Sequence, residues 1–263
     1  MPDQEPGEIS KTAFREILKA RKLGRERKQK EEEVTKSGSG IAGNVWGQYA
    51  HNYFENKVLD YDVDLGDALE AFGIDSTAKF LVERKKAGFS TNVLDLMGGD
   101  PTYFRDLNKQ VAASEPSFKQ IIDKGLSVSL GDDRSIELKE QDKKSGIDVL
   151  CGDILSKQTW AQIDLWQKNN NVEYFDFIVC RGADGIWTIP AVAYPFIFQK
   201  VWERLTDKNG LFVTQFSKSV ETEEMREMDQ ELLRKYPTMK HFVNQYQKSG
   251  GKPPVMGIIK TGK

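Results

Sequence analysis

Short apolar runs alternate with longer polar or amphipathic segments through the middle of the chain. The apolar runs are rich in Val, Ile, Leu and Phe, and five of them are candidate strands: Asn92–Met97, Leu126–Leu130, Ile147–Cys151, Phe175–Cys180 and Leu211–Phe216. The segments between them have the length of helices: Tyr103–Ala112, Ser135–Lys144, Thr159–Asn169 and Pro195–Leu205. Nearly all-apolar strands that alternate with helices are typical of a parallel sheet covered on both faces. The pattern therefore predicts an α/β fold built on a doubly wound, mostly parallel sheet.

The C-terminal part of the chain has a different pattern. His241–Tyr246 and Val255–Lys260 are strand-like and are separated by a loop rich in Lys, Gly and Pro. Two strands joined in this way predict an antiparallel pair at the end of the sheet. With the alternating region, this pair assigns residues 91–263 to one α/β domain.

The N-terminal part divides into two segments. Residues 1–40 are rich in Lys, Arg and Glu and end in Ser-Gly-Ser-Gly, a composition typical of a charged arm with a flexible linker. Residues 41–90 carry apolar side chains at helical spacing and are predicted to form a helical cap. In this cap, Asp75 or Ser76 is placed to begin a helix and Gly88 to end it.

Composition and charge exclude several classes of protein. The 263 residues are 38% hydrophobic and 30% charged, which is too apolar for a disordered chain and too polar for a membrane protein. The 38 basic and 40 acidic side chains leave a formal net charge of -2, which does not indicate a nucleic-acid partner and does not exclude one. Two cysteines and two histidines exclude zinc-finger spacing and a disulfide framework. We therefore expect a cytoplasmic protein without a membrane segment or a bound metal.

The strongest local signal is VLDLMGGDPTYF, at Val93–Phe104. An apolar strand there reaches Asp95 and runs through a Gly-Gly turn into a helix. Small residues let the backbone approach a ligand at the carboxyl edge of the sheet, where the free N–H groups of the helix also point. A plain tight turn without a ligand explains the glycines equally well. The residues at the ends of the later strands distinguish a ligand-binding turn from a plain one.

Three later strand ends add polar groups. Asp132 and Asp133 follow the second strand, where carboxylates can accept both hydroxyls of a ribose, or one of them can N-cap the helix that starts near Ser135. Asp153 and Ile154 follow the third strand, where an aspartate can bind an adenine amino group and the apolar neighbour can cover the ring. The fourth strand, FDFIVCRGADG, runs into a Gly-containing loop. In an open α/β sheet, all four strand ends line one crevice.

This order of features resembles the class I S-adenosylmethionine-dependent methyltransferases over roughly Trp46–Lys260. The resemblance implies a seven-stranded sheet with a terminal antiparallel strand pair, and S-adenosylmethionine as the cofactor. WGQYAHNY, at Trp46–Tyr53, is similar to the aromatic opening motif that many of these enzymes fold over the cofactor. The function implied is methyl transfer to an acceptor, a small molecule or a macromolecule, that the sequence does not identify.

Carried over position by position, the resemblance implies a set of cofactor-binding residues. They are Tyr49 and Tyr53 in the opening motif, Asp95, Leu96, Met97, Gly98 and Gly99 at the methionine end, Asp132 with Asp133 as its alternative at the ribose, Asp153 and Ile154 at the adenine, and Cys180 and Arg181 facing cofactor and substrate. We expect Asp132→Ala to weaken cofactor binding more than Asp133→Ala, because Asp132 lies nearer the strand end.

The glycine turn departs from the pattern of the family. The family has three glycines at alternate positions, whereas Met97 and Pro101 occupy the first and third here and only Gly99 remains. Met97 is expected to narrow the pocket and Pro101 to redirect the start of the helix. We expect Gly99→Val to abolish cofactor binding and Gly98→Ala to be milder, since the neighbouring position already carries a bulky side chain.

Methyl transfer requires the protein mainly to position the methyl donor and the acceptor. Methyl transfer from a sulfonium is an in-line displacement, and holding donor and acceptor in line can supply most of the catalysis. A general base is needed only where the acceptor loses a proton, so a missing catalytic triad does not count against this reaction. Arg181, which can steer an anionic substrate or pair with a carboxylate, and Asp184, the best-placed base, are the candidates for a catalytic role. Cys180 is expected to be a small buried residue at a strand end.

Two other functions remain open at this point. A non-catalytic binding module on the same fold would explain the altered glycine turn. An NAD-dependent oxidoreductase is disfavoured, because G-x-G-x-x-G is missing and Asp132 follows Asp95 by 37 residues rather than by ~20.

Overall fold

A seven-stranded sheet forms the centre of the computed structural model, which describes residues 57–129, 131–132, 134–181, 194–215, 230–243 and 255–262. Within these residues the strands are β1 (Asn92–Leu96), β2 (Lys124–Ser129), β3 (Ile147–Cys151), β4 (Phe177–Cys180), β5 (Lys208–Gln215), β6 (Met239–Val243) and β7 (Val255–Thr261). They lie in the order β3-β2-β1-β4-β5-β7-β6. The first five are parallel, and β7 runs antiparallel to both of its neighbours. This confirms the predicted fold class and is the sheet that the resemblance to class I methyltransferases implies.

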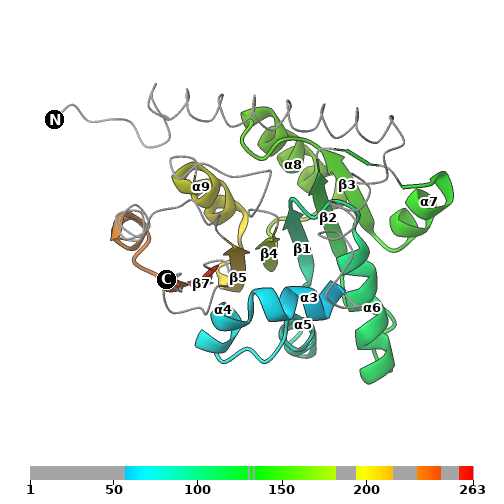
Figure 1. Ribbon diagram of the computed structural model, residues 1–263, viewed down its shortest axis with the longest axis horizontal. Coiled ribbons are helices and arrows are strands. Elements are labelled where there is room, and N and C mark those ends of the chain that lie inside the picture. Colours follow the sequence, from blue (N-terminus) through cyan, green and yellow to red (C-terminus); the bar gives the residue numbers. More distant parts are fainter. Residues whose placement is uncertain are drawn as a thin grey trace, which may run out of the picture.

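Helices cover both faces of the sheet (Figure 1). One face carries α3 (Lys57–Asp64), α4 (Gly66–Ala71), α5 (Thr77–Lys86) and α6 (Thr102–Ser114), and the other carries α8 (Lys157–Asn170) and α9 (Tyr194–Arg204). Helix α7 (Ile136–Lys144) lies beside β3 at the edge of the sheet. Alternate residues of a strand serve opposite faces: in β4, Phe177 and Val179 join one apolar cluster while Ile178 and Cys180 join the other. Burial on both faces is why the strands are apolar without alternation.

Several predicted boundaries shift by a few residues. Strand β2 begins at Lys124, two residues before the apolar run, because Lys124 and Gly125 pair with Asn92 and Val93. Strand β4 begins at Phe177, and Phe175 forms only an isolated bridge to Leu205. Backbone pairing rather than side-chain polarity decides where a strand starts.

The ends of two helices show which of the predicted capping residues cap them. Ser76 begins α5 by accepting a hydrogen bond from the Lys79 amide, and Gly88, with a φ of 80°, follows its last residues as predicted. Helix α7 is capped by Ser135, whose hydroxyl accepts from the Leu138 amide at 3.2 Å. The capping role considered for Asp132 is therefore filled by Ser135.

The helices that precede β1 share the core of the sheet. Buried Val58, Leu65 and Leu81 belong to the same apolar cluster as Val93 and Phe177 of the strands. The arm 1–40 and residues 41–56 lie outside the described residues, so the division of the chain at residues 40 and 90 stays a prediction. Among the described residues, no helix combines the length and apolar character needed to cross a membrane.

A buried ion pair ties α5 to the amino-terminal ends of β1 and β4. Arg84 Nη2 lies 2.5 Å from Asp176 Oδ1, and the two side chains are 6% and 2% exposed. The second Asp176 oxygen accepts from the Asn92 amide and the Ser90 hydroxyl, both at 2.9 Å. Asp176 thus joins three segments of the chain at the edge of the sheet opposite the predicted site.

Candidate cofactor site at the carboxyl edge of the sheet

The strand ends that we singled out are neighbours in space. Strands β3, β2, β1 and β4 are adjacent and parallel, so their carboxyl ends meet at one edge. In this register Asp95 is paired with Ser127 on one side and with Val179 on the other. The sheet therefore brings together Asp95, the β2 tip, the β3 end and Arg181, which follows the last residue of β4.

Asp95 is a buried carboxylate that is only half satisfied. It is 1% exposed, and its Oδ2 accepts a hydrogen bond from the Tyr61 hydroxyl at 2.8 Å. Its Oδ1 is buried and has no hydrogen-bond partner among the described residues. Burial raises the pKa of Asp95 to about 7, against the hydrogen bond from Tyr61 and the charge of Arg181, which both lower it. An orphaned buried acceptor of this kind is unusual in a folded protein and points to a missing partner.

This raised pKa makes the stability of the protein depend on pH. The folded state holds the Asp95 proton up to about pH 7, whereas the unfolded state releases it near the ordinary value of 3.8, so stability falls as the pH rises through this interval. We expect Asp95→Asn to match the wild type near pH 4 and to be more stable at pH 8, by up to about 4 kcal/mol, because the amide has no charge to bury. Urea denaturation across this range measures the difference.

The control for this experiment is Asp132→Asn, because the pKa of Asp132 is shifted the other way, to about 2, by hydrogen bonds from Arg134. Its stabilising charge is present above the unfolded pKa and is lost as the pH falls, so Asp132→Asn should be less stable than the wild type at neutral pH. A stability difference for Asp95→Asn that does not change with pH would contradict the assignment.

Arg181 lies against an aromatic stack from α3 and α6. The Tyr61 ring stacks on Tyr103 with centroids 3.9 Å apart, and the Arg181 guanidinium lies 5.0 Å from the centre of the Tyr61 ring. Arg181 Nε donates to Asp64 Oδ2 at 2.6 Å. Of the two roles left open for Arg181, the structure places it in an ion pair with a carboxylate.

Tyr61 and Asp64 are two residues of this site that the sequence did not predict. Tyr61 lies three residues after Val58 and four residues before Leu65, the spacing of one helix face, and all three side chains are buried in one apolar cluster. That periodicity was the signal that could have found it. Tyr49 and Tyr53 lie outside the described residues.

The turn after β1 reaches into the left-handed region at two residues. Met97 has a φ of 73° and Gly99 a φ of 64°, and the Ser127 hydroxyl donates to the Gly99 carbonyl at 3.1 Å. A Cβ on Gly98 would lie 2.3 Å from Asp95 Oδ2 and 2.7 Å from Ser127 Oγ, whereas a Cβ on Gly99 would meet nothing within 4 Å. The expectation that Gly98→Ala is milder than Gly99→Val is therefore wrong, because a Cβ on Gly98 would collide with the Asp95 carboxylate.

Met97 occupies a backbone conformation that favours glycine. A left-handed conformation costs a side-chain-bearing residue about 1–2 kcal/mol, while the partly buried Met97 side chain packs on the apolar cluster of α8 and α9. We expect Met97→Gly to be more stable than Met97→Ala by about 1 kcal/mol, because both lose the packing and only glycine removes the strain. Urea denaturation of the two variants measures this, and an Ala variant as stable as the Gly variant would contradict it.

The β2 tip is held by charge. Asp132 Oδ1 accepts from Arg134 Nε at 2.8 Å, and Asp132 Oδ2 accepts from Arg134 Nη2 at 3.1 Å. Lys139 Nζ lies 3.3 Å from Asp132 Oδ2. Both Asp132 oxygens are thus engaged by this chain, whereas Asp133, its alternative at the ribose, lies outside the described residues. The predicted order of the Asp132→Ala and Asp133→Ala effects stays a prediction.

The end of β3 forms a tight turn beside β2. The Gly152 amide donates to the Ser129 carbonyl at 2.7 Å, and Asp153 Oδ1 accepts from the Leu155 amide at 2.8 Å. Ile154 is buried, and its carbonyl accepts from the Trp160 indole at 2.8 Å. These contacts fix the turn that carries the two residues implied for the adenine.

Cys180 is the small buried residue that we expected at the end of β4. It is 1% exposed, and burial, with the nearby Asp95 charge, raises the pKa of its thiol to about 12. A thiol held neutral in this way is a poor nucleophile. Asp184, the other candidate for a catalytic role, lies outside the described residues.

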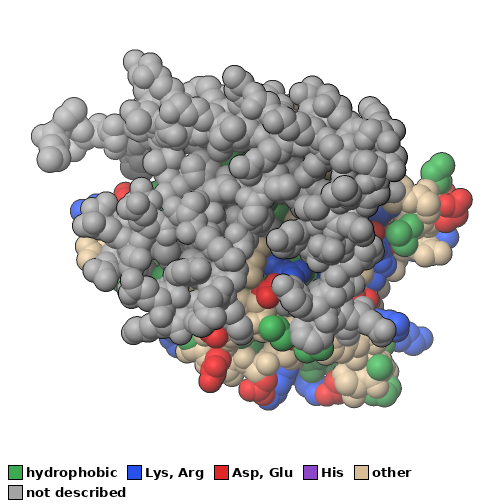
Figure 2. Space-filling view, in the orientation of Figure 1, with side chains coloured by type: hydrophobic (Ala, Val, Ile, Leu, Met, Phe, Trp, Pro, Cys, Tyr) green, Lys and Arg blue, Asp and Glu red, His purple; other side chains and the backbone are tan. Residues whose placement is uncertain are grey.

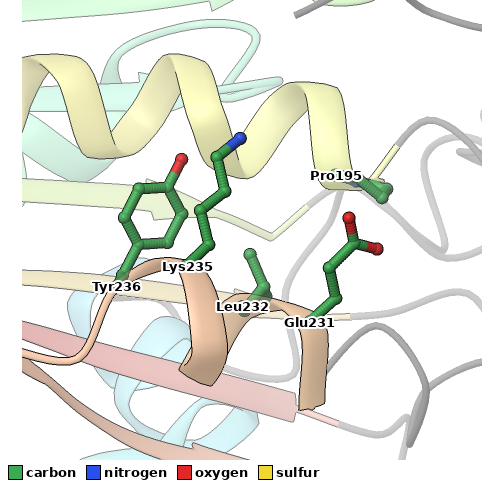
Figure 3. A pocket seen from close by; sticks show the side chains of 5 residues that line it. All are labelled: Pro195, Glu231, Leu232, Lys235 and Tyr236. Atoms are coloured by element: carbon green, nitrogen blue, oxygen red, sulfur yellow. The ribbon is translucent and has the colours of Figure 1, made fainter. Parts of the chain in front are cut away.

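A small cavity lies away from the strand ends. A cavity of about 20 Å³ between α9 and residues 230–236 is lined by Pro195, Glu231, Leu232, Lys235 and Tyr236 (Figure 3). This volume holds about one water molecule. The Tyr236 ring stacks on Trp202 at 4.5 Å, so these side chains serve the packing of α9. In the described ranges, no group of three or more His, Cys, Asp or Glu side chains is placed to hold a metal ion.

Comparison with known proteins gives matches only at the level of the fold. No protein-family model and no curated protein matches the chain. Among solved structures, the chain is similar to a Streptococcus mutans protein described as a methyltransferase and solved in complex with SAH. The two are 12% identical, the match covers 65% of this chain and 90% of that chain, and the TM-score is 0.41. A Klebsiella pneumoniae protein described as an O-methyltransferase has 10% identity, covers 70% and 80%, and has a TM-score of 0.41. An rRNA methylase from Streptococcus thermophilus has 10% identity, covers 66% and 89%, and has a TM-score of 0.38. Identities this low leave the function to be argued from the side chains of the chain itself.

Proposed function

We propose that this chain is an S-adenosylmethionine-dependent methyltransferase that holds its cofactor at the carboxyl edge of β1, β2, β3 and β4. The observation that carries the proposal is an acidic and a basic side chain, Asp95 and Arg181, at neighbouring strand ends beside the glycine turn. The amino-acid end of this cofactor carries an ammonium and a carboxylate. Asp95 is suited to the first group and Arg181 to the second.

The residues present fit such a ligand. Asp95 Oδ1 is a buried acceptor without a partner among the described residues, and an ammonium group would satisfy it. Gly99 offers an open backbone face, since a side chain there would meet nothing within 4 Å. Gly98 keeps the backbone in contact with the Asp95 carboxylate. The turn is thus shaped for close approach of a ligand to the main chain.

The rest of the cofactor would extend along the strand ends toward β3. The Asp132 or Asp133 carboxylate would receive the ribose hydroxyls, and Asp153 with Ile154 the adenine, as the resemblance implies. Asp132 is negatively charged at neutral pH, and the hydrogen bonds from Arg134 lower its pKa further, to about 2. The carboxylate is therefore in the protonation state that accepts hydroxyl donors.

Positioning is the main work that the protein has to do. When bound, the cofactor supplies a methyl group activated on a sulfonium, and the reaction is an in-line displacement. Tyr61 and Tyr103 stack on each other and Arg181 lies over the Tyr61 ring, and we propose that this group orients the donor. Arg181 and Asp184 remain the candidates for contact with the acceptor.

The surface charge bears on the choice of acceptor. Where Figure 2 shows described residues on this face of the molecule, acidic and basic side chains are interspersed, in keeping with a net charge of -2. This surface does not single out a nucleic-acid acceptor. We propose a small-molecule or macromolecular acceptor and a cytoplasmic location.

Calorimetric titration with S-adenosylmethionine, S-adenosylhomocysteine and NAD in parallel tests the proposal. We expect micromolar or tighter binding of the first two at about one site per chain. Arg181→Met should weaken S-adenosylhomocysteine but leave methylthioadenosine, which lacks the amino-acid end, unchanged. No heat and no thermal shift with any of these ligands at millimolar concentration would overturn the proposal.

A non-catalytic binding module is the second candidate. Met97 in the glycine turn and the engagement of both Asp132 oxygens by Arg134 favour it. A protein that binds S-adenosylmethionine, yet transfers no labelled methyl group to any component of a cell extract or fractionated metabolites, would support this second candidate.

A further inference from the structure

Helix α7 is attached to the protein by a charge rather than by an apolar face. Asp142 is its one buried residue, 2% exposed, while Ile136 at its first turn is 74% exposed. Surface helices normally dock through an apolar stripe. A helix whose buried contact is a carboxylate depends on the groups that neutralise that carboxylate.

Two arginines from different segments converge on Asp142. Arg105 of α6 donates through Nη1 to both carboxylate oxygens, at 2.8 and 3.1 Å. Arg134, which follows the β2 tip, donates through Nη1 to Oδ2 at 2.6 Å, and its side chain is 6% exposed. One buried carboxylate thus binds two guanidinium groups, with bonds of the strong, charge-assisted kind.

Each arginine also contacts a loop of the proposed site. Arg105 Nη2 pairs with Asp100, directly after the glycine turn, and donates to the Thr102 hydroxyl at 2.9 Å. Arg134 holds both oxygens of Asp132. Asp142 is therefore the shared partner that connects the turn after β1 to the tip of β2.

We infer that Asp142 is a positioning residue that sets the glycine turn and the β2 tip at the spacing the cofactor requires. This inference rests on the proposed function, in which the first loop holds the methionine end and the second holds the ribose. A ligand that spans both loops binds well only if they are held in register before it arrives. Lys139 of α7, which also reaches Asp132, adds a second link from the helix to the tip.

The alternative is that Asp142 only fastens α7 to the surface. The two roles predict different responses to its removal. A fastening role affects α7 and the adjoining β2 tip, whereas a positioning role also loosens the turn after β1, on the far side of Arg105. Hydrogen exchange at the two loops separates these outcomes without any ligand.

The test variant is Asp142→Asn, which keeps the shape of the side chain and removes its charge. We expect faster amide exchange, by mass spectrometry, in peptides that cover residues 97–105 and in those that cover residues 134–139. We also expect S-adenosylhomocysteine to bind at least about fivefold more weakly, as typical for coupling between linked sites. Adenosine, which lacks the methionine part, should lose less affinity than S-adenosylhomocysteine.

The matched control is Asp176→Asn, since Asp176 is equally buried and also paired with an arginine, but lies at the opposite edge of the sheet. It should lower stability while leaving exchange in the two site peptides and ligand affinity unchanged at temperatures where it is folded. Unchanged exchange at residues 97–105 in Asp142→Asn would overturn the inference. If the wild type binds no S-adenosylhomocysteine, the proposed function fails, and the exchange result alone still decides whether Asp142 links the two loops.

Discussion

Gly98→Ala is expected to abolish measurable binding of S-adenosylhomocysteine. The new Cβ would lie 2.3 Å from Asp95 Oδ2 and 2.7 Å from Ser127 Oγ, closer than real Cβ contacts allow. Both neighbours are buried and held by hydrogen bonds, Asp95 by Tyr61 and Ser127 to the Gly99 carbonyl. The turn or the carboxylate must therefore shift, and either shift displaces the groups proposed to hold the amino-acid end of the ligand.

The control for this experiment is Gly99→Ala, one residue further along the same turn. Its Cβ would meet nothing within 4 Å, and its only cost is the left-handed conformation, about 1 kcal/mol. We expect Gly99→Ala to fold and to bind measurably, and Gly99→Val, with its branched side chain, to fold and to lose binding. Calorimetry and circular dichroism on the three variants measure affinity and folding separately. A folded Gly98→Ala protein that binds like the wild type would contradict the placement of the ligand at this turn.

Asp176→Ala is expected to cause the largest loss of stability, about 3–5 kcal/mol in the free energy of unfolding. The substitution leaves buried Arg84 without its carboxylate and removes the acceptor of the Asn92 amide and the Ser90 hydroxyl. Arg84 lies against the rings of Phe80 and Phe89, at 5.6 and 5.2 Å, so its charge cannot easily turn to water. Urea denaturation at neutral pH measures the loss.

An exposed ion pair at the amino-terminal end of the same helix provides the control. Asp75 pairs with Lys79 one turn apart at the start of α5, and both side chains are more than half exposed. Water and salt screen the attraction between two exposed charges, and holding two mobile side chains together costs entropy. We therefore expect Asp75→Ala to change stability little. Similar losses in Asp75→Ala and Asp176→Ala would contradict the assignment of Asp176 as a buried junction.

The order of strands and helices was predictable because it depends on local composition. A strand buried on both faces needs apolar residues at every position, and a helix between two parallel strands needs the length to cross back. Asp176 shows the limit of this reasoning, because it stands in the apolar run Phe175–Cys180 and nothing in the run itself indicates its partner. Arg84 lies 92 residues away along the chain and meets it only in the folded protein.

In the candidate site too, some features were predictable from the sequence and others were not. From the sequence, Asp95, Gly98, Gly99 and Arg181 were predicted to lie at one edge of the sheet, since residues that follow parallel strands share one edge. Which of them are engaged by other side chains was not predictable. Arg181 binds Asp64 of a helix more than a hundred residues before it, and Asp132 is held by Arg134, which is itself anchored on Asp142 of α7.

By itself, the sequence determined the α/β class and which strand ends lie next to one another. It also showed that Met97 stands where the family pattern has a glycine. These features follow from side-chain polarity and from chain order, which are written in consecutive residues. Only the tertiary structure decided that Gly98 lies on the Asp95 carboxylate, that Tyr61 donates to it, and that Asp142 joins two loops of the site. Such contacts join residues far apart in the chain, and their energies depend on burial and on distances of a few ångströms, which no local pattern encodes.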